Sequence, residues 1–418
     1  MQTRVTISEA AEFLNISVDT IRRWEKKGLV KSARDTHNYR VFSVDELKRL
    51  QSKLNSSESH SKYQVIQTSR MSPFTSVELF AGAGGLSLGF ENAGIHGQMF
   101  VEYDKNPVAT LRKNRPDWNV VHDDVSKVDF SSMKVDILAG GFPCQAFSYA
   151  GHRLGFDDIR GTLFFEFARA IREIKPKIVV GENVRGLLNH DDGRTFQTML
   201  GVFDELGYRV EYKILRGQYL DVPQKRERLV MIGVPKNSSL KIFFPKEQDY
   251  TISMREALND VPVSEGQSYP AKKQKIMELI PEGGYWRDLP KELQKEYMGA
   301  SYFLGGGKTG MARRLAWNEP SLTLTCSPGQ KQTERCHPSE TRPLTVREYA
   351  RIQSFPDDWE FEGSVAAQYR QIGNAVPVNL GYHIGRCVVA MLEKRFDKTS
   401  MEMSIAPKSI IQDQISLF

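Results

Sequence analysis

The sequence of 418 residues is poor in cysteine, with four in all and no pair at the CxxC spacing. This scarcity argues against a disulfide framework and against a site built from cysteine pairs, so no bound metal is expected. No apolar run approaches the roughly 20 residues that span a bilayer, and no charged start leads into an apolar signal segment. These absences predict a cytoplasmic protein without a membrane partner. A hydrophobic content of 40% and a charged content of 26% are typical of globular domains, and the length favours two or three of them.

The excess of positive charge is small and unevenly distributed. The net charge is +6, but residues 1–72 hold 13 Lys and Arg against 8 Asp and Glu, while the rest of the chain holds 44 against 43. This asymmetry predicts a small module that faces nucleic acid, attached to a larger and nearly neutral part. A solvated basic face without a partner would give the same count, so that alternative stays open.

The first residues show the pattern of short helices with clear start signals. Thr6 and Glu9 have the spacing of a capping box. After a break at Asn15, Ser17 can cap a second helix, which Gly28 would end. Two short helices joined by a tight turn predict a helix-turn-helix, whose second helix enters the major groove of DNA. That helix carries four basic residues: Arg22, Arg23, Lys26 and Lys27.

A hairpin wing is expected over residues 31–42 and a third helix over residues 44–54. Residues 1–54 therefore resemble the winged helix-turn-helix of the MerR and excisionase families. The resemblance implies an N-terminal all-α winged helix-turn-helix that contacts DNA through Arg22, Arg23 and Lys26. A small helical domain for dimerisation or packing would share much of this pattern.

The rest of the chain divides by composition and periodicity. Residues 55–73 are polar and Ser-rich, which predicts a linker. From residue 74 to 235, short apolar segments alternate with helical ones, which predicts an α/β domain with a parallel sheet covered by helices on both faces. Residues 236–340 have no dominant period and are expected to form a separate, irregular domain. Amphipathic helical sequence returns over 341–396, and 397–418 has the character of a tail.

A glycine-rich turn follows the first predicted strand of the α/β domain. Its sequence, FAGAGGLSLGF, begins at Phe80 and includes Gly82, Gly84 and Gly85. Glycines at a strand-to-helix turn let the backbone approach a ligand at the carboxyl edge of the sheet. Ser87 stands where the dinucleotide fingerprint needs its third glycine, which disfavours a pyrophosphate cofactor.

Acidic residues end the next two predicted strands. Glu102 lies about twenty residues after the glycine turn, where a carboxylate can accept hydrogen bonds from both hydroxyls of a ribose. The third strand ends at Asp123 and Asp124, either of which could bind an adenine amino group. This arrangement indicates a ligand that carries a nucleoside without a demanding phosphate, and S-adenosyl-L-methionine is the common one.

Four further motifs follow in order. The predicted fourth strand breaks at Pro143–Cys144 within GGFPCQAFS; ENV begins at Glu182, QKRERL at Gln224 and GNAVP at Gly373. A single free cysteine is most often a small buried residue without a chemical role. These motifs together, however, resemble those of the cytosine-5 DNA methyltransferases, and the resemblance spans about residues 77 to 392.

The resemblance implies a doubly wound, S-adenosyl-L-methionine-dependent methyltransferase sheet with a smaller, irregular target-recognition domain at 236–340. It assigns Cys144 as the nucleophile that adds to carbon 6 of cytosine, and Glu182 as an acid near ring nitrogen 3. Arg228, together with Arg226, would orient the base and stabilise negative charge. Cofactor contacts are expected from Phe80, Gly82, Gly84, Gly85, Glu102, Tyr103, Asp124, Pro143 and Asn374. The base that removes the proton from carbon 5 is not identified.

Double-stranded DNA is the expected partner, because a stacked cytosine must be flipped out of the helix to reach a cysteine at the sheet edge. The loop after Cys144, with Arg153, is the candidate lid, and Gln224 is a further candidate DNA contact. The irregular domain offers Arg313, Arg314, Gln330, Lys331 and Arg335 as DNA contacts, although each could be ordinary surface charge. A monomer is expected on DNA.

Two questions stay open at this stage. The last residues, Gln414–Phe418, have the sequence QISLF, which is similar to the peptide that docks bacterial proteins on the replication sliding clamp; an uninvolved tail is the alternative.

The ENV motif at Glu182 lacks the second cysteine that RNA cytosine-5 methyltransferases usually have, which favours DNA over RNA as substrate. One tRNA-directed branch of the family nevertheless shares the DNA-type motifs. An inactive, purely regulatory DNA-binding protein would have lost PCQ or ENV, and both are present. The leading hypothesis is the modification enzyme of a restriction–modification system.

Overall fold

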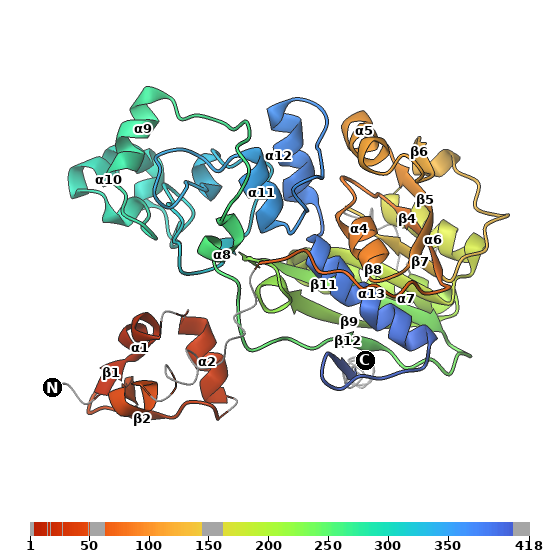
Figure 1. Ribbon diagram of the computed structural model, residues 1–418, viewed down its shortest axis with the longest axis horizontal. Helices are drawn as coiled ribbons and strands as arrows, with labels where there is room; N and C mark the ends of the chain where they lie inside the picture. Colours follow the sequence, from red (N-terminus) through yellow and green to blue (C-terminus); the bar gives the residue numbers. More distant parts are fainter. Residues whose placement is uncertain are drawn as a thin grey trace.

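The computed structural model describes residues 4–143 and 162–403, apart from Asn15, Ser17, Lys27, Arg49 and the stretch 51–62. Three parts are visible in Figure 1. A small N-terminal domain (residues 4–50, red) lies beside a sheet domain, and a third part, here called the small lobe, is built from segments between residues 254 and 374.

A seven-stranded sheet forms the centre of the sheet domain. Its strands lie in the order β6 (Val120–His122), β5 (His96–Glu102), β4 (Thr75–Leu79), β7 (Ile137–Gly140), β8 (Ile178–Val184), β11 (Glu227–Pro235) and β9 (Tyr208–Arg216). The first five strands are parallel, but β11 is antiparallel to both β8 and β9. The prediction of a wholly parallel sheet is therefore wrong at this end, because β9 is a half-buried strand whose charged residues hide its apolar pattern.

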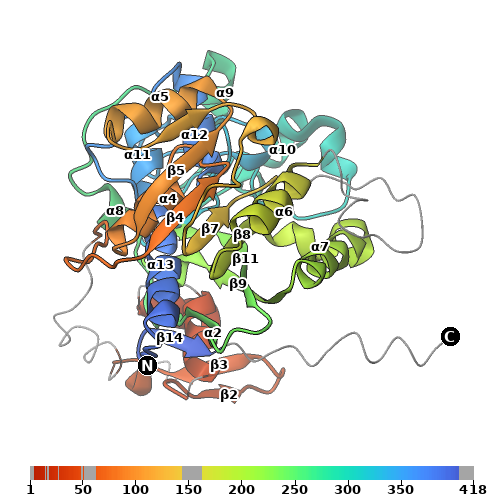
Figure 2. The same cartoon turned by 90° about the vertical axis from the view of Figure 1, so that its right-hand side faces the viewer.

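Helices cover both faces of this sheet, as predicted for a doubly wound fold. Figure 2 shows α6 (Leu163–Ile174) and α7 (Arg194–Glu205) on one side, and α4 (Gly85–Asn92), α5 (Lys105–Asn114) and α13 (Val378–Leu392) on the other. Alternate residues of β11 serve the two cores: Leu229 and Met231 pack toward α6 and α7, whereas Val230 and Ile232 pack toward α4 and α13.

Helices α4 and α13 approach each other closely enough that only glycine fits between them. A Cβ atom on Gly89 would lie 2.6 Å from the carbonyl oxygen of Val378 and 2.7 Å from the Cα of Gly381. The helical stretch Val365–Leu392 is, by length and composition, able to cross a membrane, but 78% of its apolar window is buried inside the protein. That burial is typical of core helices in a folded domain.

The small lobe shares its core with the sheet domain. Its elements are α8 (Met254–Leu258), α9 (Ala271–Glu278), α10 (Lys291–Met298), β13 (Ser321–Leu322), α11 (Val346–Ile352) and α12 (Val365–Asn374). Apolar residues of α8, α11 and α12 form one cluster with residues of α4 and α5. Strand β10 (Gln224–Lys225) also pairs with β13 across the two parts. A second cluster, around Trp286 and Met277, is confined to the irregular segment.

Two predicted boundaries lie elsewhere in the structure. Strand β12 (Phe243–Pro245) pairs with β14 (Met401–Met403), and Phe243, Phe244 and Met401 join the core beneath α13. The sheet domain therefore extends to residue 245, and its C-terminal part extends to residue 403. The predicted linker is also shorter, because residues 63–72 pack on the sheet domain: the amide of Ile66 donates to Asn379 Oδ1 at 2.9 Å, and the amide of Thr68 donates to the carbonyl of Asn92.

The N-terminal domain is a winged helix-turn-helix, but it is not all-α. Helices α1 (Ile7–Phe13) and α2 (Val18–Lys26) are separated by only four residues of the chain, and residues 44–48 are helical. Strands β1 (Arg4–Thr6), β3 (Arg40–Ser43) and β2 (Ser32–Arg34) form a small antiparallel sheet, of which β2 and β3 are the predicted wing. The capping box of Thr6 and Glu9 is confirmed.

Short 3-10 helices complete the fold: η1 (Val125–Lys127), η3 (Arg185–Gly193), η4 (Gly217–Tyr219), η5 (Trp286–Asp288), η6 (Gly299–Phe303) and η7 (Lys331–Thr333).

The contact between α4 and α13 predicts opposite effects for two helical glycines. Gly89→Ala should lower the melting temperature, because its methyl group meets backbone atoms that cannot move aside and overpacking costs about 1–3 kcal/mol. Gly201→Ala in α7, where nothing lies within 4 Å of the added atom, should raise the melting temperature slightly, by about 0.5–1 kcal/mol of helix propensity. Thermal unfolding of both variants measures the difference. Equal melting temperatures would contradict the close helix contact.

Candidate active site

The turn after β4 has the backbone conformation that its glycines predict. Phe80, Gly82 and Gly84 have φ angles of +60°, +55° and +87°, and α4 begins directly after Gly84. Left-handed residues at these positions turn the chain sharply at the sheet edge, and the amide of Gly82 donates to Glu102 Oε2 at the end of the neighbouring strand at 2.8 Å. Phe80 adopts this conformation without being glycine, which is a local strain of the kind found at functional sites.

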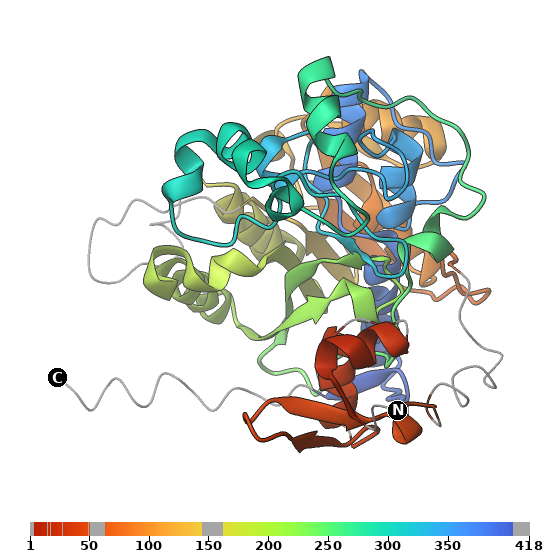
Figure 3. The ribbon, with the colours of Figure 1, turned by 90° about the vertical axis from the view of Figure 1, so that its left-hand side faces the viewer.

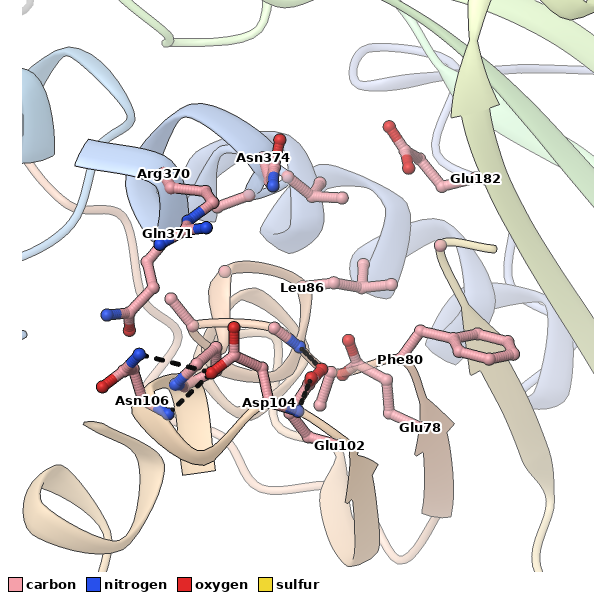
Figure 4. Close-up of a pocket in the computed structure, with 18 of the residues that line it drawn as sticks. Glu78, Phe80, Leu86, Glu102, Asp104, Asn106, Glu182, Arg370, Gln371 and Asn374 are labelled. Carbon is pink, nitrogen blue, oxygen red and sulfur yellow. Dashed lines mark hydrogen bonds between the residues drawn. The ribbon is translucent and has the colours of Figure 1, made fainter. Parts of the chain in front are cut away.

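A cavity of about 240 Å³ opens between this turn and α12. Figure 4 shows Glu102 and Asp104, at the end of β5, on one side, with Arg370, Gln371 and Asn374 of α12 opposite them. Five of the predicted cofactor residues line it: Phe80, Gly82, Gly85, Glu102 and Asn374. Glu182 reaches the same cavity from β8. The structure thus brings together residues that lie almost three hundred positions apart in the sequence.

Glu102 is held rigidly at the floor of the cavity. Its Oε2 accepts a hydrogen bond from the amide of Gly82 at 2.8 Å, and its Oε1 accepts from the amides of Tyr103 and Asp104 at 2.9 and 2.8 Å. A carboxylate has about four acceptor sites. These contacts therefore fix the side chain and leave acceptor capacity on Oε2 for a hydroxyl group.

Glu78 is a buried carboxyl group beneath the cavity that sequence reasoning missed. The hydroxyl of Ser87 donates to its Oε2 at 2.6 Å. Burial, reinforced by the nearby charges of Glu102 and Glu182, raises the pKa of Glu78 to about 8, although the Ser87 hydrogen bond lowers it. A glutamate inside an otherwise apolar predicted strand was the available signal. Asp104, Asn106, Arg370 and Gln371 also line the cavity and were missed.

Glu182 and Arg228 form a buried ion pair across neighbouring strands. In the β8–β11 register Glu182 lies opposite Val230, so Arg228, two residues away, lies diagonally beside it on the same face. The Nε atom of Arg228 is 2.7 Å from Glu182 Oε1, and each side chain is 11% exposed. Burial raises the pKa of Glu182 despite the opposing effect of Arg228 and Arg226.

Residues 141 and 142, which lead to the predicted nucleophile, contact side chains of the neighbouring strand β8. Asn183 donates from Nδ2 to the carbonyl oxygen of Phe142 at 2.7 Å. A Cβ atom on Gly141 would lie 3.0 Å from Glu182 Oε2, so a glycine here leaves room for that carboxylate. Cys144 and Arg153 lie outside the described residues.

Arg226 does not face the predicted base-binding side, and this prediction needs correction. Its side chain is only 1% exposed, and it donates to the carbonyl oxygens of Leu324, Gly373 and Ala375 at 3.2, 2.9 and 3.0 Å. Burial, with a further contribution from Arg228, lowers the pKa of Arg226 to about 9. Arg226 therefore holds the GNAVP segment against the small lobe instead of touching a substrate.

Four predicted cofactor residues do not line the cavity. Gly84 packs under Trp359, Tyr103 is 73% exposed, and Pro143 is exposed as well. Asp124 caps η1 by accepting from the amide and hydroxyl of Ser126 at 2.9 and 2.8 Å. Asp123 is instead paired with Lys127. Neither aspartate is among the described residues that line the cavity, and Asp104 occupies the position nearer to it.

Several predicted DNA contacts are buried and serve the fold. Gln224 is 0% exposed and bonds to Gln353 and to the amide of Leu324; Arg314, 4% exposed, donates to the carbonyls of Met277 and Ile280. Both predictions are wrong for this conformation, because neither side chain reaches the surface. Arg335 is also buried and donates from Nε to the carbonyl oxygen of Thr323 at 2.9 Å. Arg313 lies 3.7 Å from Glu319. Arg22 and Lys26 are exposed on α2.

The other cysteines show no catalytic arrangement. Cys336 and Cys387 are buried, whereas Cys326 is exposed and its thiol lies 3.1 Å from Asn374 Oδ1 at the edge of the cavity. Within the ranges that the structure describes, no group of three or more His, Cys, Asp or Glu side chains could hold a metal ion.

Comparison with known proteins supports both parts of the chain. A family model described as C-5 cytosine-specific DNA methylase matches residues 74–390, and a model described as MerR family regulatory protein matches residues 6–42. The Escherichia coli protein named Type II methyltransferase M.Eco47II is 53% identical over 94% of this chain and 97% of its own length. Type II methyltransferase M.PspPI of Psychrobacter sp. (strain TA137) is 52% identical over 91% of this chain and 95% of its own length.

A solved structure shares the fold. The putative DNA modification methyltransferase encoded within an E. coli prophage superposes with a TM-score of 0.56 at 24% identity, covering 77% of this chain and 99% of that one. At this identity the likeness is one of fold.

The buried carboxyl group of Glu78 predicts a specific dependence of stability on pH. The folded protein holds a proton on Glu78 that the unfolded chain loses above its ordinary pKa of 4.5, so stability falls as the pH rises from there toward 8. Glu78→Gln removes this loss. In thermal unfolding at several pH values, its melting temperature relative to the unmodified protein should increase between about pH 5 and pH 8 and level off above that range.

Glu278→Gln provides the matched control, because Glu278 is exposed on α9. The melting temperature of this variant should keep a constant difference from that of the unmodified protein. A constant difference for Glu78→Gln as well would show that Glu78 is ionised throughout this range.

Proposed function

The chain belongs to the C-5 cytosine-specific DNA methylase family and is a type II DNA cytosine-5 methyltransferase, and we propose that it works through a covalent adduct between Cys144 and a flipped cytosine. The observation that carries this mechanism is the buried pair of Glu182 and Arg228, 2.7 Å apart at the sheet edge from which the Cys144 turn begins.

Covalent addition makes cytosine reactive at carbon 5. The thiolate of Cys144 adds to carbon 6, forming a sulfur–carbon bond, and the electrons of the 5,6 double bond move toward carbon 5 and the ring. Carbon 5 then forms a bond to the methyl group, while the bond between that methyl group and the sulfur of the methyl donor breaks and leaves its electron pair on the sulfur. Loss of the proton from carbon 5 to a base re-forms the double bond as the sulfur–carbon bond breaks, which restores the thiolate.

Glu182 is suited to assist this addition at ring nitrogen 3. Burial raises the pKa of its carboxyl group, so Glu182 takes up a proton more readily than an exposed glutamate and can share that proton with the ring while negative charge develops there. Arg228 lies against the same carboxyl group and supplies fixed positive charge beside the base. Asn183 donates to the carbonyl of Phe142, two residues before Cys144 in the chain, and so fixes the end of the segment that leads to the proposed nucleophile.

The cavity residues fit S-adenosyl-L-methionine as the methyl donor. When bound, this cofactor supplies an electrophilic methyl group. Glu102 has remaining acceptor capacity for a ribose hydroxyl, and Phe80 offers an aromatic ring at the entrance of the glycine turn. Asn374 closes the cavity from α12, and Asp104 is the carboxylate best placed to bind the adenine amino group in place of the predicted Asp124.

Double-stranded DNA is the proposed substrate, and the modification half of a restriction–modification system is the proposed role. The name shared by the relatives that cover almost the whole chain, type II methyltransferase, supports this role. The winged helix-turn-helix adds a second DNA-binding element through Arg22 and Lys26. The sliding clamp stays a proposed partner of Gln414–Phe418, which lies outside the described residues.

Methylation mapping tests this function. Expression in a host without cytosine-5 methylation should add 5-methylcytosine to genomic DNA at one short sequence, read by bisulfite sequencing. Cys144→Ser should reduce this methylation at least about 1000-fold, because a hydroxyl group is hardly ionised at neutral pH and cannot replace the thiolate.

The same strains distinguish DNA from RNA as substrate. New 5-methylcytosine in tRNA together with unmodified DNA would show that the substrate is RNA. Unchanged DNA methylation by Cys144→Ser would rule out the covalent mechanism.

A further inference from the structure

The second helix of the helix-turn-helix packs against the sheet domain. The guanidinium carbon of Arg23 lies 3.7 Å from the ring centroid of Tyr219 in η4, and Trp24 donates from Nε1 to the carbonyl oxygen of Asp249 at 3.1 Å. Figure 3 shows the N-terminal domain against the lower side of the sheet domain, with the small lobe above both. Here we call these contacts the docking contact.

The docking contact covers Arg23, one of the three basic residues with which α2 is expected to meet DNA, whereas Arg22 and Lys26 stay exposed beside it. Asp19 and Arg23 are one helical turn apart, and Arg22 and Lys26 lie alongside them. Asp19 also lines a cavity of about 290 Å³ that it shares with Arg216, Lys225 and Arg228 of the sheet domain. A recognition helix must fit into a major groove about 12 Å wide, with DNA on both sides of it. The sheet domain occupies that space, so docking and groove binding by α2 exclude each other.

The docking contact leaves part of Arg23 unsatisfied. Both terminal nitrogens of this side chain are buried, and neither has a hydrogen-bond partner in the part of the chain that the structure describes. Tyr219 already carries a second cation, because the guanidinium of Arg216 lies 4.8 Å from the same ring. A buried guanidinium group whose N–H groups form no hydrogen bonds stabilises the contact much less than one that is fully bonded. A DNA phosphate, or the O6 and N7 atoms of a guanine, could accept hydrogen bonds from two of these N–H groups at once. The balance therefore favours exchange of Arg23 onto DNA.

The surface that receives α2 is built to stay in place when α2 leaves. The amide of Gln248 donates to the carbonyl of Tyr219 at 2.9 Å, and its side chain donates to Asp221 Oδ2 at 2.6 Å. Asp221 is also bonded to His383 and, through its carbonyl, to Asn379 of α13. This network holds η4 on the core of the sheet domain without help from the N-terminal domain.

The connection between the two domains is long enough for the exchange. Leu50 is the last described residue of the N-terminal domain, and Tyr63 begins the segment that packs on the sheet domain. Twelve residues lie between them, and an extended chain of this length spans roughly 40 Å. The domain can therefore leave Tyr219 and remain tethered beside the enzyme.

We propose that α2 has two competing partners, the docking surface at Tyr219 and the major groove of duplex DNA, so that the catalytic domain holds the helix-turn-helix closed until DNA displaces it. The inference rests on the proposed DNA-binding role of this domain and not on the proposed covalent mechanism. It makes the apparent DNA affinity of the helix-turn-helix depend on the undocked fraction of the protein.

A substitution on the sheet domain that weakens its contact with α2 tests this competition. Tyr219→Leu in the full chain removes the ring under Arg23 and leaves the recognition helix unchanged. The probe is a fluorescent 30-bp duplex of alternating A and T, which contains no cytosine for the catalytic site. Fluorescence anisotropy at one fixed salt concentration should show about tenfold tighter binding, as expected if at least nine-tenths of the protein is docked.

Two controls make the result specific. Tyr212→Leu changes the same residue type on β9, where the ring packs on Phe196 at 4.7 Å, and should bind the duplex like the unmodified protein. Adding Arg23→Ala to Tyr219→Leu should abolish the tighter binding. Unchanged or weaker binding by Tyr219→Leu, or tighter binding that survives Arg23→Ala, would overturn the proposal.

Hydroxyl-radical labelling of the unmodified chain gives an independent reading if Tyr219→Leu does not fold. Saturating A·T duplex should increase labelling of Tyr219, because this side chain is only 1% exposed in the docked state and undocking uncovers its ring. Unchanged or lower labelling of Tyr219 would also overturn the proposal.

Discussion

Glu182 and Arg228 are the pair around which the sheet edge is organised, with 2.7 Å between Arg228 Nε and Glu182 Oε1. Two charges that are each nearly buried are stable only as partners, since removing one of a buried pair typically costs about 3–5 kcal/mol. Strand β11 lies antiparallel beside β8, and this register brings residues 228 and 182 together on the same face. The reversed strand is thus what places Arg228 beside Glu182 in this sheet.

The motif that contains Arg228 also ties the two parts of the enzyme together. Gln224 and Arg226 bind Leu324 of the small lobe, Arg226 binds the carbonyls of Gly373 and Ala375, and Gln353 binds Ala375 as well. Asn374, between those two carbonyls, lines the cavity between the glycine turn and α12. One short segment therefore contains Arg228 and sets the positions of the small lobe and of the cavity wall. Gln224 and Arg226 of this segment bind main-chain groups of the protein.

Motifs in the sequence predicted which residues lie together around the cavity at the sheet edge. The glycine turn, Glu102, Glu182 and Asn374 converge on one cavity as expected, and the order of strands and helices predicts the doubly wound sheet. Sequence alone does not show whether a polar side chain is buried. For this reason the roles predicted for Gln224, Arg226 and Arg314 differ from those in the structure, where each side chain binds main-chain groups inside the fold. Glu78 shows the converse, since a carboxyl group within a strand is recognisable in sequence only as an anomaly. The docking of α2 depends on contacts between distant segments, which no local pattern contains.

The rate of covalent adduct formation tests the central claim most directly. Duplex DNA with 5-fluorocytosine at the target position traps the adduct after methyl transfer, because fluorine cannot leave as the proton does. The account predicts an adduct at Cys144 that survives denaturation and forms about 10²- to 10⁴-fold more slowly with Glu182→Gln, while the affinity for the duplex stays nearly the same. An adduct at another residue, or equal rates for the unmodified enzyme and Glu182→Gln, would contradict it.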